Sequence, residues 1–264
     1  APARAAQRPR QLRRPERTLV RANGKNAFAM RYRFVDCRWE LGNAERGREL
    51  YREGHIPGAA FLDVEQDLSG APGERGRHPL PTDEQFSTAA SSAGIEDGVF
   101  VVAYGSMGGA ERLWWLLRHY GHDDCAVLDL AGWHGPLRGG PEAVEPAEFV
   151  PRPRTDDTIG PDELAARLGD LVVVDARLAP RWRGEPNPID RVPGRIPGAH
   201  NAPWDEPLPT LPPGEVVAYC GSGVTACVAL HRLALAGREA KLYPGSWSEW
   251  EQRPDLPVEA GRRA

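Results

Sequence analysis

The sequence predicts an α/β protein made of two tandem domains, each a parallel sheet flanked by helices. Three observations lead to this prediction. The same order of landmarks occurs twice along the 264 residues, short apolar runs alternate with helical patterns in both copies, and a proline-rich stretch lies between the copies. Short apolar runs bounded by turns and followed by helical patterns are typical of buried parallel strands joined by crossover helices.

The repeated landmarks are Val-Asp-x-Arg (35–38 and 174–177), Gly-x-Ile-Pro-Gly-Ala (54–59 and 194–199) and an apolar run that ends in tyrosine (99–104 and 216–219). Each tyrosine leads into a glycine-rich turn and then a helical pattern. Each copy finishes on a short apolar strand followed by a glycine and a tryptophan. Internal similarity in a fixed order indicates that one structural unit was duplicated.

The boundary between the copies falls at residues 141–157, where prolines and charges occur without apolar periodicity, as in an exposed linker. We therefore expect a tail at 1–30, a first domain at 31–140 and a second domain at 158–264. The tail is rich in arginine, and its prolines interrupt any amphipathic targeting helix, so a flexible, solvated tail is favoured over a targeting segment.

The two copies are not equal. A helix is expected at 82–95 in the first copy, whereas the matching connection of the second, 204–214, is short and proline-rich. The second copy opens with a helix at 161–168, which begins with a proline and two acids. No clear counterpart of that helix precedes residue 35.

Composition excludes several classes of function. A net charge of −4 and 41% hydrophobic residues describe an ordinary globular protein and provide no charge argument for a nucleic-acid partner. No apolar run approaches the ~20 residues that span a bilayer, so we expect a cytoplasmic protein with no membrane partner. Four cysteines are too few and too irregularly spaced for a disulfide framework or a zinc site, and no metal is expected.

The chemistry is expected in the loop after the second tyrosine strand. Cys220 stands there, where the first copy has Gly105, and the residues Gly221, Ser222, Gly223, Val224 and Thr225 follow it. A glycine-rich turn from a parallel strand into a helix points backbone N–H groups into one concavity, which favours an anion. A cysteine at its rim is expected to be shifted toward the reactive thiolate. Cys37, Cys125 and Cys227 are interpreted as packing residues.

This loop, the paired Gly-x-Ile-Pro-Gly-Ala elements and the segment Tyr-Pro-Gly-Ser-Trp-Ser-Glu-Trp at 243–250 resemble the two-domain rhodanese and 3-mercaptopyruvate sulfurtransferase family over roughly residues 34–252. The resemblance implies a silent first domain and a second domain that carries the cysteine. It implies a double displacement in which Cys220 takes sulfur from a small donor as a persulfide and passes it to an acceptor. The resemblance implies no cofactor, and it leaves cyanide, a small thiol and a protein thiol reductant open as acceptors.

The resemblance also bears on the donor. An uncharged loop after the cysteine resembles the members that use mercaptopyruvate, whereas members that prefer thiosulfate carry Arg-Lys there. A keto-acid carboxylate still needs a cation, which a bidentate arginine supplies best. Arg181 is the stronger candidate by similarity and Arg191 the weaker, while Arg183 is expected to be a surface charge. Thiosulfate remains the alternative donor.

In relatives that use mercaptopyruvate, a serine, a histidine and an aspartate from the two domains act as a proton relay. Asp63, His78 and Ser246 are the residues that match by resemblance. A carboxylate-oriented imidazole can protonate the departing enolate through a hydroxyl. If the three residues meet, the active site lies at the domain interface.

Two other readings are less well supported. A cysteine phosphatase would need an arginine after five residues to grip phosphate, and Ala226 occupies that position. The second is a non-enzymatic module that binds persulfide or has a regulatory role. An unreactive residue at the cysteine position of both loops would favour it, and Cys220 removes that support.

Overall fold

The computed structural model describes residues 31–260, so the predicted tail at 1–30 lies outside the described part. The elements of the first half are β1 (Arg31–Cys37), α1 (Arg46–Glu53), β2 (Ala60–Phe61), α2 (Asp83–Ser92), β3 (Val99–Gly105), α3 (Gly109–His119), β4 (Cys125–Leu128) and the 3-10 turn η1 (Leu130–Gly132). Its four strands form one sheet in the order β2-β1-β3-β4, and every neighbouring pair is parallel.

The second half repeats this plan. Its elements are α4 (Pro161–Ala166), β5 (Val172–Asp175), α5 (Ala179–Trp182), β6 (His200–Asn201), β7 (Val216–Tyr219), α6 (Ala226–Leu235), β8 (Ala240–Leu242) and α7 (Ser246–Trp250). The sheet order β6-β5-β7-β8 matches the first sheet strand for strand, again with parallel pairs only. The predicted fold class is therefore confirmed.

Buried hydrogen bonds explain why the same motifs occur in both halves. The carboxylate of Asp175 accepts from the guanidinium of Arg177, which also donates to the Gly194 carbonyl at 2.8 Å. The Tyr219 hydroxyl accepts from the backbone N–H of Ile196 at 3.1 Å. These bonds fix the Gly-x-Ile-Pro-Gly-Ala element against the sheet and satisfy polar groups that burial would otherwise leave unpaired. The first half makes the same contacts with Asp36, Arg38, Gly54, Tyr104 and Ile56.

The unequal connections are also present. Helix α2 begins after Thr82, whose hydroxyl accepts from the Gln85 N–H while the Gln85 side chain accepts from the Thr82 N–H, a capping box. Residues 204–214 contain no helix or strand. The predicted helix at 82–95 and the shortened connection are both confirmed.

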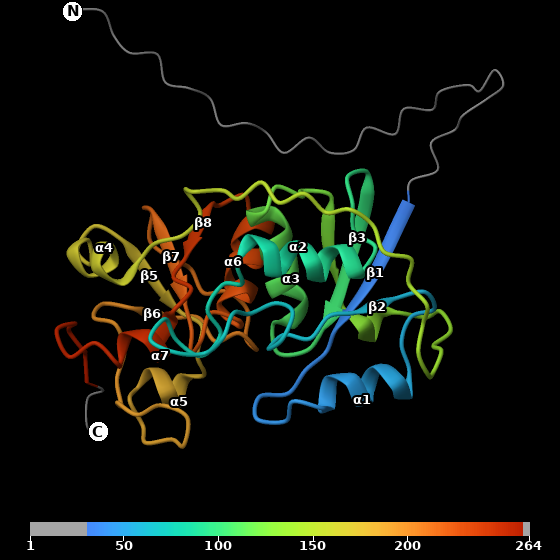
Figure 1. Ribbon diagram of the computed structural model, residues 1–264. Helices are drawn as coiled ribbons and strands as arrows, with labels where there is room; N and C mark the ends of the chain where they lie inside the picture. The colour runs from blue at the N-terminus through green and yellow to red at the C-terminus, as the bar shows by residue number, and fades with distance from the viewer. Residues whose placement is uncertain (1–30, 261–264) are drawn as a thin grey trace, which may run out of the picture.

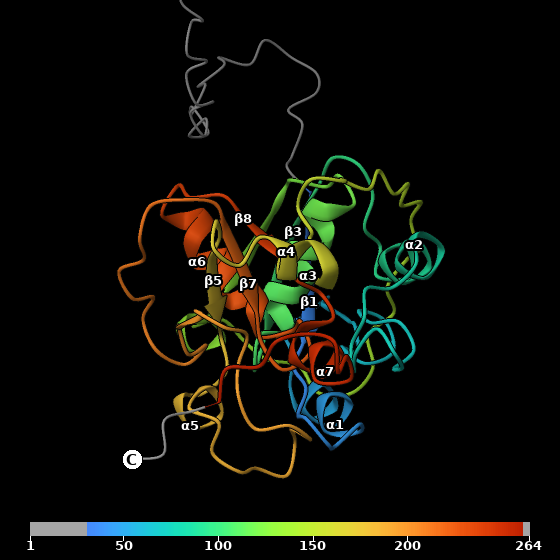
Figure 2. The same cartoon turned by 90° about the vertical axis from the view of Figure 1, so that its left-hand side faces the viewer.

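The two halves pack through α3 and α6, which Figure 1 shows between the two sheets. The Trp114 ring meets the His231 ring edge-on at 4.8 Å, and one apolar cluster continues from the first sheet into the second. Helices α1, α5 and α7 gather at one end of the molecule in both views (Figures 1 and 2), and each follows the carboxyl end of a strand. Crevices at that end are where open parallel sheets bind ligands.

Residues 141–157 form neither helix nor strand but run along the first half, where Phe149 is buried and the Arg152 N–H donates to the Tyr120 carbonyl. Within residues 31–260, no helix has the length and apolar character needed to cross a membrane.

Candidate active site

Cys220 lies directly after β7 and is almost completely buried. The Gly223 N–H donates to its Sγ at 3.1 Å, so the loop turns back toward the sulfur as an anion-binding turn does. Gly223 has φ 84°, and a Cβ there would lie 2.4 Å from the Pro244 carbonyl oxygen, so only glycine fits. The loop geometry therefore brings a backbone donor to the thiol.

The start of α7 holds this loop in place. The Cys220 N–H donates to the Ser246 Oγ at 3.1 Å, and the Trp247 N–H donates to the Cys220 carbonyl at 3.0 Å. The Ser246 hydroxyl donates its own proton to the Tyr243 carbonyl. Ser246 therefore supports the backbone of the loop. The expected relay requires a contact between Ser246 and His78, and the structure does not show one.

The serine that meets His78 is Ser222. The His78 Nδ1 lies 2.8 Å from the Ser222 Oγ, a buried contact between the two domains. The edge of the His78 ring also packs against Trp39, with ring centroids 5.5 Å apart. A histidine from the first domain thus reaches the hydroxyl two residues after the cysteine.

Asp63 does not orient His78 in this structure. Its Oδ1 accepts from the N–H groups of Glu65 and Gln66, which closes a tight turn. The carboxylate that approaches the imidazole is that of Glu65, with an Oε1 to Nε2 distance of 3.6 Å. Glu65, on the same turn as Asp63, is therefore the carboxylate that approaches His78, at a distance longer than a hydrogen bond.

Burial, together with the positive charges of Arg112 and Arg77, lowers the pKa of His78 to about 4. An unfolded histidine binds a proton below pH ~6.5, whereas folded His78 resists protonation until near pH 4, so acidification across this window favours unfolding. We expect His78 to account for a loss on the order of 3 kcal/mol in the free energy of unfolding over that range. Urea unfolding of the wild type and His78→Gln at several pH values between about 7 and 4 measures it. Equal pH slopes for the two proteins would contradict the expectation.

The two predicted arginines have different positions. Arg181 on α5 donates to Asp190 with two nitrogens, at 2.8 and 2.5 Å. A Cβ built on Gly221 would lie 2.8 Å from its Nη2, so this guanidinium covers the loop. Arg191 is exposed; its backbone N–H is bound by Glu251, and no side-chain bond of Arg191 reaches the loop in the described part of the chain. Arg183 pairs with Glu185 at the surface, in line with the expectation.

A second guanidinium at Gly221, that of Arg77, was not among the predicted site residues. Its Nη2 would lie 3.2 Å from a Cβ on Gly221, and it donates weakly to the Gly221 carbonyl at 3.5 Å. Its position next to His78 in the sequence was the one signal that could have pointed to it.

Val224 and Thr225 lie against the first domain. A Cβ on Gly108 would lie 3.0 Å from the Thr225 Cα and 3.2 Å from the Val224 carbonyl oxygen. The close approach of these backbones explains the glycine at 108. The two residues thus locate the Cys220 loop at the domain interface.

Arg112 ties together the two segments that meet in the site. It is fully buried on α3 and donates to the carbonyls of Gly223, His78, Pro79 and Leu68 at 3.2 to 3.3 Å. The contact with Gly223 crosses from the first domain to the Cys220 loop. The Arg112 side chain therefore fixes the position of the Cys220 loop relative to the segment that carries His78.

The other cysteines have no comparable setting. Burial raises the pKa of Cys125 and of Cys227 to about 12, and it raises that of Cys37 well above the usual range, which keeps these thiols protonated. No cluster of His, Cys, Asp and Glu suited to a metal ion occurs among residues 31–260.

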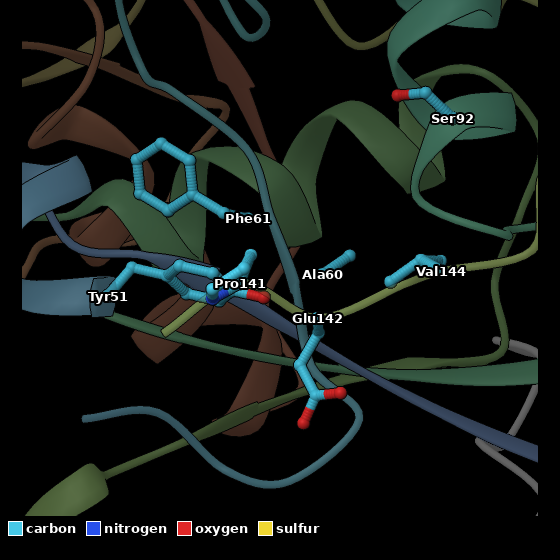
Figure 3. A pocket seen from close by; sticks show the side chains of 7 residues that line it. All are labelled: Tyr51, Ala60, Phe61, Ser92, Pro141, Glu142 and Val144. Atoms are coloured by element: carbon cyan, nitrogen blue, oxygen red, sulfur yellow. The ribbon is translucent and has the colours of Figure 1, made fainter. Parts of the chain in front are cut away.

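Figure 3 shows a separate hollow in the first half of the molecule, and it shares no residue with the Cys220 site. Its one carboxylate, Glu142, already accepts from the Gly58 N–H and from Arg138. The hollow is lined by Tyr51, Ala60, Phe61, Ser92, Pro141, Glu142 and Val144.

Two copies of one parallel-sheet unit with a single cysteine loop define the class: a tandem-domain protein of the rhodanese fold. The rhodanese-like domain model matches residues 20–134 and 160–253, and the chain belongs to that family. Its curated relatives are named sulfurtransferases, and this chain is an enzyme of that class.

Two relatives and one solved structure illustrate the similarity. A Pseudomonas aeruginosa protein named "Probable 3-mercaptopyruvate sulfurtransferase" is 41% identical over 261 residues, covering 86% of this chain and 92% of that protein. "Thiosulfate/3-mercaptopyruvate sulfurtransferase 2" of Arabidopsis thaliana is 31% identical over 279 residues, covering 85% of this chain and 80% of that protein. The crystal structure of SseA from Escherichia coli, described as a 3-mercaptopyruvate sulfotransferase, is 30% identical with a TM-score of 0.70, covering 83% of this chain and 93% of that one.

Proposed function

We propose that the enzyme moves a sulfur atom from 3-mercaptopyruvate to a thiophilic acceptor through a persulfide on Cys220. The supporting observation is the position of the Cys220 sulfur, which accepts from the Gly223 N–H and lies in a loop covered by guanidinium groups. The loop itself contributes no charged side chain. This combination suits a thiol nucleophile with an anionic donor whose charge is at one end.

In the first half-reaction, the Cys220 thiolate attacks the donor sulfur. The new S–S bond forms as the bond between that sulfur and carbon 3 breaks, and the electron pair leaves on carbon as pyruvate enolate. The enolate must then be protonated. Ser222 is placed to deliver its hydroxyl proton to carbon 3, because it is hydrogen-bonded to His78. His78 is neutral near neutral pH, so it replaces that proton from Nδ1 while its Nε2, on the partly exposed Glu65 side, takes up a proton from solvent.

In the second half-reaction, the acceptor attacks the outer sulfur of the persulfide and regenerates the thiolate. Cyanide and small thiols are acceptors of suitable chemistry, and a protein thiol reductant is a further one. A reactive thiol is best preserved where thiols are kept reduced, so the cytoplasm is the proposed compartment.

Thiosulfate is the second candidate donor. Two guanidinium groups beside Gly221 could also hold a dianion, an observation that favours this alternative. Thiosulfate leaves as sulfite, which needs no proton on carbon.

The test compares the two donors. Incubation with 3-mercaptopyruvate is expected to add one sulfur atom to the protein by mass spectrometry and to release pyruvate. The kcat/KM for 3-mercaptopyruvate is expected to exceed the kcat/KM for thiosulfate by roughly tenfold or more, because only the keto acid uses the proton donor. A preference for thiosulfate would assign the alternative donor, and no adduct with either donor would refute the persulfide.

A further inference from the structure

Gly221 lies between two guanidinium groups that come from different domains. Arg181 belongs to α5 of the second domain, and Arg77 belongs to the loop of the first domain that also carries His78. A Cβ there would lie 2.8 Å from the Arg181 Nη2 and 3.2 Å from the Arg77 Nη2, so a side chain at 221 would crowd both guanidinium groups. Both cations therefore face the residue directly after Cys220.

The two arginines differ in their charge partners. Arg181 is balanced by Asp190, and the adjoining Arg177 by Asp175. No carboxylate in the described structure lies within ion-pair distance of Arg77, and its buried Nε has no hydrogen-bond partner there. Of the two guanidinium groups at Gly221, that of Arg77 is therefore the one whose charge no carboxylate balances.

The backbone around Arg77 is held firmly. Its N–H donates to the Ser248 Oγ at 3.0 Å, and the Ser248 N–H donates to the Gly221 carbonyl at 2.9 Å. Gly76 has φ 98° and packs so closely on Gly245 that a Cβ would lie 2.6 Å from its carbonyl oxygen. The second domain thus fixes the base of the Arg77 side chain at a set distance from the Cys220 loop, which is how a preorganised anion site is built.

We propose that Arg77 holds the carboxylate of the sulfur donor together with Arg181, so that the donor is bound across the domain interface and Arg191 takes no part. This inference rests on the proposed function. Burial and the nearby charge of Arg181 lower the pKa of Arg77, and a bound carboxylate would relieve this repulsion. It would also supply an acceptor for the Arg77 Nε, which has no hydrogen-bond partner in the described structure.

The test uses Arg77→Gln and Arg77→Lys with two donors, 3-mercaptopyruvate and mercaptoacetone, its neutral analogue without the carboxylate. For Arg77→Gln we expect KM for mercaptopyruvate to rise roughly 10- to 100-fold and kcat to change less, because charge-assisted bonds to the carboxylate are lost. Arg77→Lys should recover part of the loss, since it keeps the charge without the fork. The kinetics with mercaptoacetone should stay within about threefold.

Arg75→Gln is the matched control, because Arg75 is an exposed arginine on the same loop, and it should leave both donors unaffected. Arg191→Gln tests the rival arginine. An effect of Arg191→Gln as large as that of Arg77→Gln would overturn the proposal. An equal loss with both donors would also overturn the proposal, because it would show that Arg77 acts on the Cys220 thiolate and not on the donor carboxylate.

A binding measurement separates this inference from the proposed function. Calorimetric titration of 3-hydroxypyruvate, which has the carboxylate but no transferable sulfur, into Cys220→Ser protein should give a Kd that rises by a similar factor when Arg77→Gln is added. An unchanged Kd would refute the role of Arg77 even in an active enzyme. An enzyme inactive with every donor would refute the proposed function and leave this titration as the test of Arg77.

Discussion

Cys220→Ser is expected to reduce turnover with 3-mercaptopyruvate by roughly 10⁴-fold or more, because the serine hydroxyl remains protonated and cannot carry the transferred sulfur. The same variant should show no sulfur adduct in the mass spectrum after incubation with the donor. The Gly223 N–H can donate to a serine oxygen as it does to the sulfur, so the loop should keep its shape. Steady-state release of pyruvate measures the loss.

Cys125→Ser is the matched control for this prediction. The Cys125 thiol donates to the carbonyls of Trp114 and His122, bonds that a hydroxyl can also make, and it lies in the first domain outside the loop. Its activity should stay within about twofold of the wild type. A Cys220→Ser protein with substantial turnover, or a comparable loss in Cys125→Ser, would contradict the assignment of the nucleophile.

The fold could be predicted because its signals are local and occur twice. The apolar runs that end in Tyr104 and Tyr219 mark the central strands, and the Val-Asp-x-Arg motifs mark their neighbours. Each motif also supplies the buried bonds that lock its own half. Because the pattern occurs twice, each copy supports the interpretation of the other, and the strands of both sheets are parallel as expected.

The partner of His78 could not be read from the sequence with the same certainty. Ser222 and Ser246 both lie near Cys220, and 144 positions separate His78 from Ser222 along the chain. Which hydroxyl meets the imidazole depends on how the two domains dock, and docking is set by α3, α6 and the bonds of Arg112. The resemblance pointed to Ser246, whose hydroxyl is engaged by backbone groups.

The same limit applies to the charged residues. Arg191 is the nearer candidate to α5 in sequence, but Glu251 binds its backbone at the surface. Arg77 is far away in sequence and becomes a neighbour of Gly221 only when the first domain packs against α7. The Cys220 loop can be recognised from a few adjacent residues. Which charged groups surround it depends on how the two domains pack.

The first domain has no cysteine at the position that matches Cys220, yet it contributes side chains to the site. Gly105 stands at the position that matches Cys220 and is the last residue of β3, where a Cβ would lie 2.8 Å from the carbonyl oxygen of Cys37, its partner on β1. The domain instead contributes His78, Arg77 and Arg112 to the loop of its partner. One copy therefore carries the cysteine, and the other places guanidinium and imidazole side chains beside its loop.

His78→Gln is the second variant with a large expected effect. If the Ser222–His78 pair protonates the departing enolate, kcat with 3-mercaptopyruvate should fall roughly 10²-fold, the usual contribution of a positioned general acid. Glutamine can still bond the Ser222 hydroxyl, so the loop should remain in place. Thiosulfate needs no protonation at carbon, so its turnover should stay within a few-fold of the wild type.

Ser222→Ala and the double variant complete the experiment. Because the two side chains act as one unit, the double variant should lose little more than either single variant with mercaptopyruvate. Transfer of sulfur to the acceptor from protein already loaded with persulfide should be unaffected, because the enolate has left by then. Equal losses with both donors, or additive losses in the double variant, would show that His78 supports the loop instead of moving the proton.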